Sequence, residues 1–295
     1  MTRGAQRFNN RATELVRICS NEHYFVAKML ARAVQLFIRY SASVQRKERL
    51  HHIVSAIVDN LSMEVPELAA QFDVSEATIR RDLELLEEQQ LVSRTRGGAT
   101  THVAFNDLPL GFKTSQDLDE KRRIAHSALA FLDGARVVGM TGGTTTNEFA
   151  RQLLGRRGLT VVTNALNIAT SLVSSPGLRV FAAGGEVRSS SQEVVGPSAE
   201  AFLSEYNIDV SFLGVDGVDT EAGCTNYDPV GARVNGAMRA RSRMTIVLAD
   251  ATKIGRVALA SVCSMSEVDV LITDSRAPQS AVDAIQRQGC RVICA

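Results

Sequence analysis

Apolar residues recur at every third or fourth position in two short runs between Val65 and Leu86. The first run consists of Val65, Leu68, Ala69 and Phe72, and the second of Ile79, Leu83 and Leu86. This spacing predicts two short amphipathic helices, each with one apolar stripe to bury. Ser75 stands between them and is a good N-cap, because its hydroxyl can accept a backbone N–H at the start of the second helix. The pattern therefore predicts a helix, a tight turn and a second helix.

A third apolar stripe precedes this pair, and a short basic segment follows it. The stripe consists of Leu50, Ile53, Val54, Ile57, Val58 and Leu61, which predicts another helix. Residues 91–98 have the pattern of a strand, a glycine turn and a returning strand. Together these elements predict a three-helix winged helix-turn-helix domain over residues 45–101.

From about Asp117 onwards, short apolar runs alternate with helical patterns. A helix is expected over residues 121–132, and strands over residues 137–140, 159–162, 178–182, 210–215, 244–248, 268–272 and 292–294. This alternation predicts an α/β domain over residues 117–295, in which helices cover both faces of a mostly parallel sheet. Pro109 and Gly111 lie in the segment between the two domains, so residues 102–116 are expected to form a linker.

The second helix and the basic hairpin carry the residues expected to contact DNA. These candidates are Ser75, Thr78, Arg80, Arg81, Arg94 and Arg96. The first turns of a recognition helix contact base edges and phosphates, and arginine suits both because its planar guanidinium can pair with guanine or hold a phosphate. Acidic residues outnumber basic ones between Gln45 and Phe105, so the prediction depends on placement rather than on net charge. The alternative is an ordinary pair of helices with solvated charges.

Small and polar residues follow five of the predicted strands. The candidate effector-binding residues among them are Gly142, Gly143, Thr144, Thr145, Thr146, Thr163, Asn164, Gly184, Gly185, Glu186, Asp216, Gly217 and Lys253. Loops at the carboxyl ends of parallel strands share one edge of the sheet, which is where ligands bind. Each loop taken alone is more often just a turn, but their recurrence at successive strand ends favours a site.

The chemistry of these loops favours a phosphorylated sugar. The glycine–threonine loop, residues 142–146, enters a helix, so its N–H groups and hydroxyls can hold an oxyanion. Lys253 can add a positive charge, while Glu186 and Asp216 can accept hydrogen bonds from sugar hydroxyls. The loop lacks the Gly-Lys-Ser/Thr ending of a nucleotide P-loop, and the two glycines at 184–185 lack the dinucleotide-binding spacing.

Composition adds a few constraints. The chain has 295 residues and a formal net charge of +1, which demands neither a nucleic-acid nor a membrane partner. No apolar run is long enough to span a membrane, so a cytoplasmic protein is expected. Its five cysteines have neither C-x-x-C nor paired zinc-ligand spacing, so no metal is expected, and the glycine loops described above indicate no other cofactor.

Residues 1–44 differ from the rest, because their many arginines and Lys28 are opposed only by Glu14 and Glu22. Three explanations compete: a basic arm that adds non-specific DNA affinity, a targeting segment, or residues from a start codon assigned too far upstream. The last explanation, or a loosely ordered arm, is favoured.

The motifs described above closely resemble those of the DeoR family of bacterial transcription regulators. Residues 74–83, V-S-E-A-T-I-R-R-D-L, are similar to its helix-turn-helix signature, and Arg96 stands where the family usually has histidine before Gly-Gly-Ala. The family's sensor-domain motifs are also present, at residues 142–146, 163–164, 184–186, 195–197, 216–217 and 253–255. The resemblance, from about Gln45 to the C-terminus, implies a sensor fold similar to sugar-phosphate isomerases and a sugar phosphate or related inducer. One stretch departs: many members have a helix with Glu and Lys-Arg where this chain has Gly231 and Asn235-Gly236.

These observations predict a transcriptional regulator rather than an enzyme. Its expected partners are double-stranded operator DNA and a phosphorylated sugar that releases a homodimeric or homotetrameric repressor of a carbohydrate-metabolism operon. One alternative is a sugar-phosphate isomerase with a fused DNA-binding module, in which Asp216, Asp219 and Lys253 would transfer protons. Another is a sensor domain that binds nothing and serves only in oligomerisation.

Overall fold

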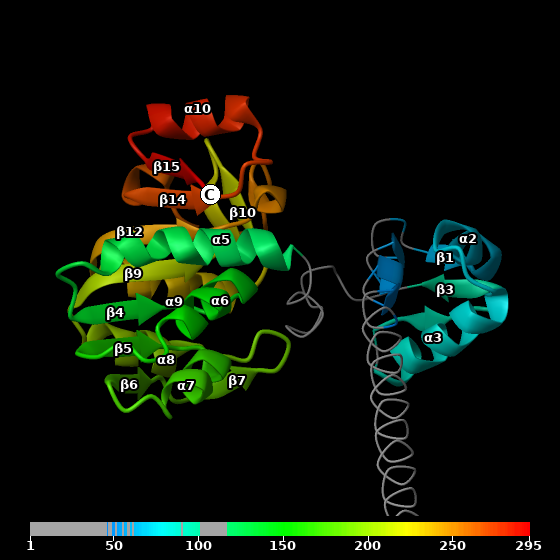
Figure 1. Ribbon diagram of the computed structural model, residues 1–295, viewed down its shortest axis with the longest axis horizontal. Helices are drawn as coiled ribbons and strands as arrows, with labels where there is room; N and C mark the ends of the chain where they lie inside the picture. Colours follow the sequence, from blue (N-terminus) through cyan, green and yellow to red (C-terminus); the bar gives the residue numbers. More distant parts are fainter. Residues whose placement is uncertain are drawn as a thin grey trace, which may run out of the picture. The chain divides into compact units, whose positions relative to one another are not determined.

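The computed structural model describes residues 46, 49–50, 52–54, 56–57, 60, 62–89, 91–100 and 117–295 (Figure 1). The chain forms two compact units, Met1–His102 and Val103–Ala295, which we call the winged unit and the sheet unit. The expected extension over residues 1–44 and the expected linker over residues 102–116 lie outside the described residues.

Three helical segments build the winged unit. The described residues between 46 and 60 are helical, and they are followed by α2 (Val65–Gln71) and α3 (Glu76–Glu88). The predicted stripes are buried, as shown by Leu50, Ile53, Val54, Ile57, Val65, Leu68, Ile79, Leu83 and Leu86. Glu64 and Glu67 form a capping box at the start of α2, and Ser75 caps α3. The helix, turn and helix are therefore present as predicted.

A small antiparallel sheet completes the winged unit. It contains β1 (Ser62–Glu64), β2 (Ser93–Arg94) and β3 (Gly98–Thr100) in the order β1-β3-β2. The Val65 N–H donates to the Gly97 carbonyl over 2.8 Å, which ties the start of α2 to the hairpin turn. The predicted winged helix-turn-helix is thereby confirmed.

The sheet unit is built around seven parallel strands in the order β15-β14-β12-β9-β4-β5-β6. They are β4 (Val137–Met140), β5 (Leu159–Thr163), β6 (Leu178–Ala182), β9 (Ile208–Gly214), β12 (Ser242–Leu248), β14 (Val270–Thr273) and β15 (Arg291–Cys294). Each matches one of the seven predicted strands. The strand order changes direction between β4 and β9, and at such a position the loops diverge and leave room for a ligand.

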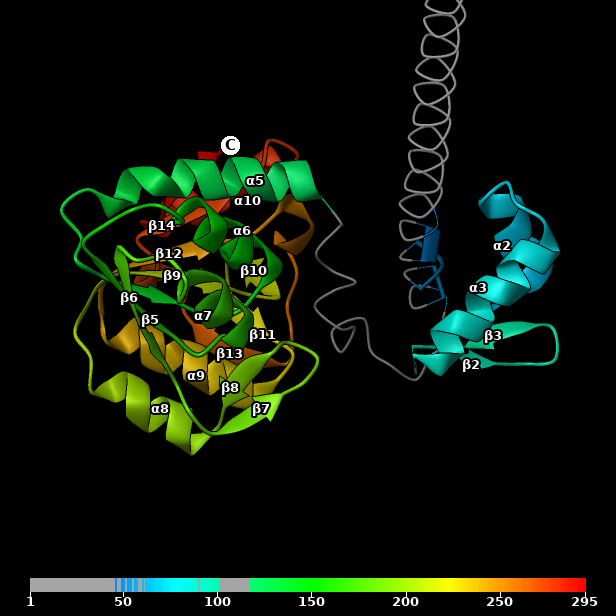
Figure 2. The ribbon, with the colours of Figure 1, turned by 60° about the horizontal axis from the view of Figure 1, so that its bottom comes forward.

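Helices cover both faces of this sheet (Figures 1 and 2). One face packs against α5 (Leu118–Ala128), the 3₁₀ turn η2 (Leu129–Leu132), α6 (Thr144–Gln152) and α7 (Leu166–Leu172). The other packs against α8 (Pro197–Ser204), α9 (Pro229–Ala240) and α10 (Gln279–Arg287). Successive strand residues alternate between the two cores, as Ile246 and Val247 do in β12, which is the period of two expected for a buried strand.

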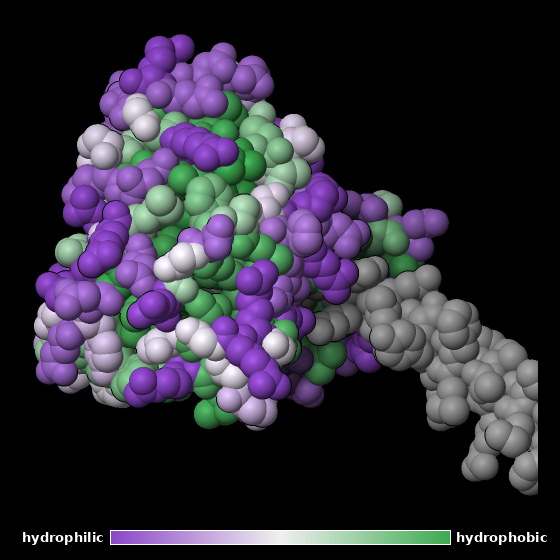
Figure 3. All heavy atoms as spheres, turned by 60° about the vertical axis from the view of Figure 1, so that its left-hand side comes forward, coloured by the Kyte–Doolittle hydropathy of each residue, from purple (hydrophilic) through white to green (hydrophobic). Residues whose placement is uncertain are grey.

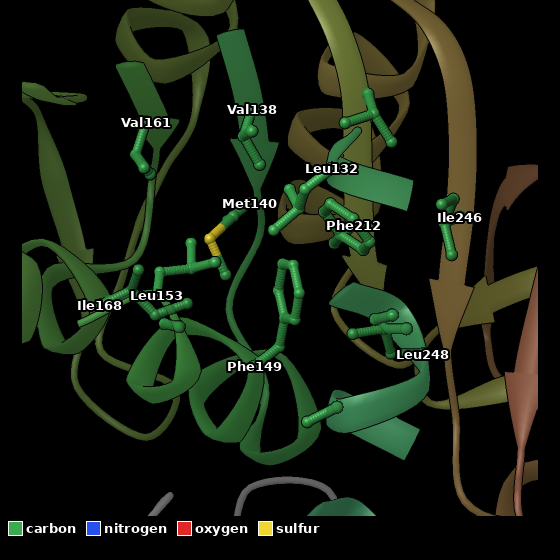
Figure 4. Packing of buried hydrophobic residues seen from close by; sticks show 14 of the residues in the cluster. Leu132, Val138, Met140, Phe149, Leu153, Val161, Ile168, Phe212, Ile246 and Leu248 are labelled. Carbon is green, nitrogen blue, oxygen red and sulfur yellow. The ribbon is translucent and has the colours of Figure 1, made fainter. Parts of the chain in front are cut away.

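The first core brings α6 against the middle of the sheet. The rings of Phe149 in α6 and Phe212 in β9 lie 4.1 Å apart between their centroids, and Leu132 and Met140 surround them (Figure 4). This contact fixes the start of α6 above the ends of β4 and β9.

Several short strands escaped prediction. They are β7 (Glu186–Arg188) and β8 (Glu193–Val195), which form a hairpin, and β10 (Gly217–Asp219), β11 (Gly223–Asn226) and β13 (Ala260–Cys263), which form an antiparallel sheet. The hairpin and β10–β11 follow β6 and β9 along the chain, so they extend the carboxyl-end side of the main sheet. Figure 3 shows the surface after a turn that brings the left-hand side of Figure 1 forward. Hydrophilic and hydrophobic residues are both exposed on this face.

Candidate functional site

The start of α3 is held in a defined geometry by Ser75. Its Oγ accepts the Thr78 N–H over 3.2 Å and lies 2.9 Å from the Thr78 hydroxyl. Both residues retain solvent exposure, Ser75 more than Thr78. The cap thus positions the first turn of the helix, whose other side is buried by Ile79.

The two arginines on this helix are not equivalent. Arg80 donates to Glu76 one turn earlier over 2.8 Å, and both side chains are about half exposed. Arg81 is exposed and makes no ion pair with any residue that the structure describes. An exposed pair of this kind contributes little stability, so Arg80 can exchange Glu76 for a phosphate at small cost.

Asp82, the residue after these arginines, serves a structural role that the sequence did not reveal. Its carboxylate is 1% exposed and accepts hydrogen bonds from Arg46 Nε over 3.0 Å and from Arg49 Nε over 2.7 Å. These bonds anchor α3 to the first helical segment of the winged unit, which contains Arg46 and Arg49. The motif Arg80-Arg81-Asp82 therefore combines two outward cations with one inward anchor.

The wing offers one restrained and one unrestrained arginine. Arg94 donates through Nη1 to Glu84 over 3.2 Å, and its backbone N–H donates to Glu87 over 3.1 Å. Arg96 is exposed at the hairpin turn and makes no ion pair with the described residues. Thr95 closes this turn by accepting the Gly98 N–H over 3.0 Å. All six predicted DNA-binding residues thus lie on α3, at its cap or on the wing.

A cavity lies at the carboxyl ends of the strands of the sheet unit, between β4, β9 and β12. Six predicted effector-binding residues line it: Gly142, Gly143, Thr144, Thr145, Asp216 and Lys253. It also contains residues that sequence reasoning did not select: Arg188, Ser190, Ser191, Glu193, Asn226, Asp228, Gly231, Asn235 and Asp250. The first four come from the β7–β8 hairpin, whose short strands gave no periodic signal.

The remaining predicted residues do not line the cavity, and some of them support its wall. Thr146 and Thr163 are fully buried; the first donates to the Gly143 carbonyl over 3.0 Å and the second accepts the Ala165 N–H over 3.0 Å. Asn164 donates to Glu193 and to the Val194 carbonyl.

Four further predicted residues lie beside it. Gly184, Gly185 and Glu186 are exposed at the start of the β7–β8 hairpin, and Gly217 is buried in the β10–β11 pairing.

The glycine loop, residues 142–146, forms the end of the cavity at which we expect an anion to bind, called here the anion-binding end. Gly143 is the N-cap of α6 and has φ of 135°, a conformation that favours glycine. The first N–H groups of a helix have no intrahelical acceptor, so those of α6 are available at this end. Gly214 at the end of β9 passes so near that a Cβ there would lie 2.3 Å from the Gly142 carbonyl oxygen. The loop therefore depends on glycine in a neighbouring strand as well as on its own.

Glu193 occupies one donor of this loop. Its Oε1 accepts the Gly142 N–H over 2.9 Å and the Asn164 Nδ2 over 3.3 Å. Burial raises the pKa of Glu193, an effect that the Gly142 N–H partly offsets and that the nearby Asp216 carboxylate reinforces. A negatively charged ligand at the loop would raise this pKa further.

One lysine lines the cavity, and a second, on α5, lies within electrostatic reach of the first. Lys253, in the 3₁₀ turn η3 (Ala251–Lys253), lines the cavity and makes no ion pair within the described part of the chain. Lys121 on α5 is 3% exposed; burial lowers its pKa, and the nearby carboxylate of Asp250 opposes that shift. Lys253 therefore supplies positive charge to the cavity, and Lys121 lies near enough to Asp250 and Lys253 for their charges to shift its pKa.

Two other classes of site are absent from the part of the chain that the structure describes. Its His, Cys, Asp and Glu side chains form no group of three or more that could hold a metal ion. None of its helices combines the length and the apolar character needed to cross a membrane.

Comparison with known families identifies both units. Residues 49–103 match the DeoR-like helix-turn-helix domain, and residues 116–275 match the DeoR C terminal sensor domain. The chain belongs to the DeoR family. Its similarity to named transcriptional regulators extends over most of its length, as the following relatives show.

The glycerol-3-phosphate regulon repressor of Escherichia coli (strain K12) is 31% identical over 242 residues, which cover 82% of this chain and 96% of that protein. The HTH-type transcriptional regulator GlpR of Haloferax volcanii is 33% identical over 247 residues, which cover 83% of this chain and 96% of the relative. Among solved structures, ribose 5-phosphate isomerase A from Methanocaldococcus jannaschii aligns with 47% of this DeoR-family chain and 55% of that chain, at 17% identity and a TM-score of 0.36. A score this low has no bearing on the fold, which follows from the strand pairing.

Proposed function

We propose that this DeoR-family protein is a sequence-specific DNA-binding repressor that a phosphorylated sugar or related intermediate releases from its operator. The observation that supports the proposal is the composition of the cavity. The start of α6 and Lys253 lie in the same cavity as carboxylate and amide groups that can accept hydrogen bonds from hydroxyl groups. A ligand that combines an anionic group with several hydroxyl groups matches both the helix start with its lysine and the hydrogen-bond acceptors. The name of the glycerol-3-phosphate regulon repressor supports the same ligand class.

The winged unit supplies the DNA contacts in this proposal. Thr78, Arg80 and Arg81 face outwards from the first turns of α3 and are suited to the major groove. Arg96 at the wing tip and Arg94 beside it are suited to the phosphates or the minor groove.

In the proposed mechanism, ligand binding to the sheet unit changes how the DNA-binding helices of an oligomer are spaced. A homodimer or homotetramer would present paired recognition helices at the spacing of two operator half-sites, and ligand binding would favour an arrangement with another spacing. The ligand must bind the arrangement that does not match the operator more tightly than the arrangement that does. A change in the ratio of these two populations from 1:99 to 99:1 requires about 5.5 kcal/mol of differential affinity.

A catalytic role is the weaker candidate. Asp219 lies in β10 and does not line the cavity, so the carboxylate and lysine set considered for an isomerase is not assembled there. Asp216 uses one oxygen to accept the Tyr227 N–H over 3.1 Å. The named relatives described above are transcriptional regulators.

The experiment is a gel shift at stated salt concentration, using the DNA upstream of the protein's own gene and of neighbouring genes. Specific retardation that one member of a sugar-phosphate panel reverses would support the proposal, and Lys253→Ala should weaken that reversal while sparing the retardation. Arg157→Ala, an exposed substitution outside the cavity, serves as the matched control. Retardation of every fragment alike would contradict sequence specificity, and turnover of a panel compound would favour the isomerase.

A further inference from the structure

One amide oxygen in the cavity wall is buried without a hydrogen-bond donor. Asn235 lines the cavity from α9 and is 2% exposed. Its Nδ2 donates to the Gly214 carbonyl over 2.9 Å, which fixes the orientation of the amide because only the nitrogen can donate. Its Oδ1 has no donor among the described residues. A buried acceptor without a donor is unfavourable, so the site favours a ligand group that donates to it.

Asn235 adjoins the anion-binding end of the cavity. Gly214, which accepts its hydrogen bond, lies against Gly142 of the glycine loop. Gly231, one helical turn earlier on α9, lines the same cavity and has no side chain to fill it. A ligand whose anionic group lies at the start of α6 therefore has Asn235 in its immediate surroundings.

Two carboxylates of the cavity wall are also acceptors. Asp216 accepts the Tyr227 N–H with Oδ2, and Asp250 accepts the Thr252 N–H with Oδ1, so each retains a second carboxylate oxygen. Asp228, in contrast, uses both oxygens to accept N–H groups at the start of α9. The second oxygens of Asp216 and Asp250, like the Asn235 Oδ1, favour a ligand that carries donors, and hydroxyl groups meet that requirement.

We infer that Asn235 determines effector specificity, with its Oδ1 accepting a hydrogen bond from a hydroxyl group of the bound ligand. The inference rests on the proposed function of the sheet unit as a sensor of phosphorylated polyols. In this arrangement α9 contacts the hydroxyl-bearing part of the ligand, and the start of α6 and Lys253 bind its phosphate.

The test measures affinity in the full-length protein by calorimetry, with inorganic phosphate, glycerol 3-phosphate, D-ribose 5-phosphate and D-glucosamine 6-phosphate as probes. Asn235→Ala should weaken the tightest-binding organic phosphate by about tenfold, as expected for one lost hydrogen bond, and should leave the affinity for inorganic phosphate within about twofold. Asn235→Ser provides a second variant if the alanine variant unfolds. Asn207→Ala, at an exposed asparagine outside the cavity, is the control.

The outcomes distinguish the role of Asn235 from the proposed sensor function. An equal loss for inorganic and organic phosphates would show that Asn235 merely positions Gly214 and the glycine loop, and an unchanged affinity for every probe would exclude it from recognition. If the wild-type protein binds inorganic phosphate but none of the organic phosphates, the proposed sensor function fails, and the role of Asn235 fails with it. Loss confined to the organic phosphates would support the inference.

Discussion

Arg276 Nη1 donates to Asp117 Oδ1 over 2.7 Å, although 159 positions separate the two residues in the chain. The same guanidinium donates to Asp274, whose carboxylate is fully buried. Asp274 Oδ2 also accepts the Ala251 N–H over 2.7 Å, in the turn that carries Lys253 into the cavity. Hydrogen bonds thus connect the cavity wall with the first described residue after the predicted linker.

We expect Arg276→Ala to uncouple ligand binding from DNA release. The variant should lose about 1 to 2 kcal/mol of stability, less than for a fully buried pair because Arg276 is about half exposed. Its DNA affinity without ligand should match that of the wild type, while the ligand concentration needed for release should rise. Gel shifts with a ligand titration, together with urea unfolding, measure both effects.

The control for this variant is Arg287→Ala, at an exposed arginine on α10 that makes no ion pair within the described part of the chain. If Arg276→Ala and Arg287→Ala respond to ligand alike, the hydrogen-bonded connection does not transmit the signal.

Substitution of the recognition-helix arginines should separate specific from general binding. Arg81→Ala is expected to cost about 1 to 3 kcal/mol of specific affinity, because an unpaired, exposed guanidinium is free to contact a base. Competition gel shifts with operator and unrelated DNA measure the difference. The same loss on both DNAs would instead assign Arg81 to a phosphate.

Glu76→Gln should strengthen DNA binding. The substitution releases Arg80 from an ion pair of 2.8 Å and removes a negative charge from the start of α3. The effect should be modest and should diminish with added salt, since an exposed pair contributes about 0 to 1 kcal/mol. A decrease in affinity at every salt concentration would mean that Glu76 positions Arg80 for its contact.

Gly214→Ala should damage the effector cavity and spare the winged unit. A Cβ at Gly214 would lie 2.3 Å from the Gly142 carbonyl oxygen, so the glycine loop must move, at a cost of about 1 to 3 kcal/mol. We expect DNA retardation without ligand-dependent release. Gly184→Ala is the matched control, because its Cβ would meet nothing within 4 Å; release retained in the Gly214 variant would show that the loop tolerates displacement.

Glu193→Gln should change how stability depends on pH. Because burial raises the pKa of Glu193, the folded protein keeps a proton that the unfolded chain releases, so this group favours folding most at low pH. Its contribution falls as the pH rises from the ordinary glutamate pKa to the folded pKa, and then becomes constant. Glutamine does not titrate, so the stability of the variant relative to the wild type should increase over that window.

Urea unfolding of both proteins between about pH 4 and pH 8 covers the ordinary glutamate range and its upward shift. Glu205→Gln, at an exposed position, is the control across the same range. A constant difference for Glu193→Gln would mean that the folded state does not shift the pKa of Glu193.

The sequence predicted the elements whose burial produces a recognisable pattern of apolar residues. Each strand of the main sheet lies between two cores, so apolar residues such as Val138 and Val247 form continuous runs, and α3 shows its stripe because only one side is covered. The strands β7 and β10 have three residues each, too few to reveal a period.

Part of the cavity could be predicted because parallel strands bring their carboxyl ends together. Glu193 could not be predicted, since its contact with Gly142 spans 51 positions and depends on how the β7–β8 hairpin folds over the sheet. Asn235 stood out in the sequence only as a departure from the residues that the family usually has there, and the local pattern did not indicate that it lines the cavity.

The strand order has a consequence for newly synthesised protein. β4 pairs with β9 and β9 with β12, so the glycine loop has no complete surroundings until the chain has grown beyond Lys253. The winged unit requires only the first third of the chain. At about 5 to 20 residues per second, translation of the remainder takes about 10 to 40 seconds. Early in that interval the nascent chain contains the whole winged unit, which we assign to DNA, but not all the residues that line the cavity.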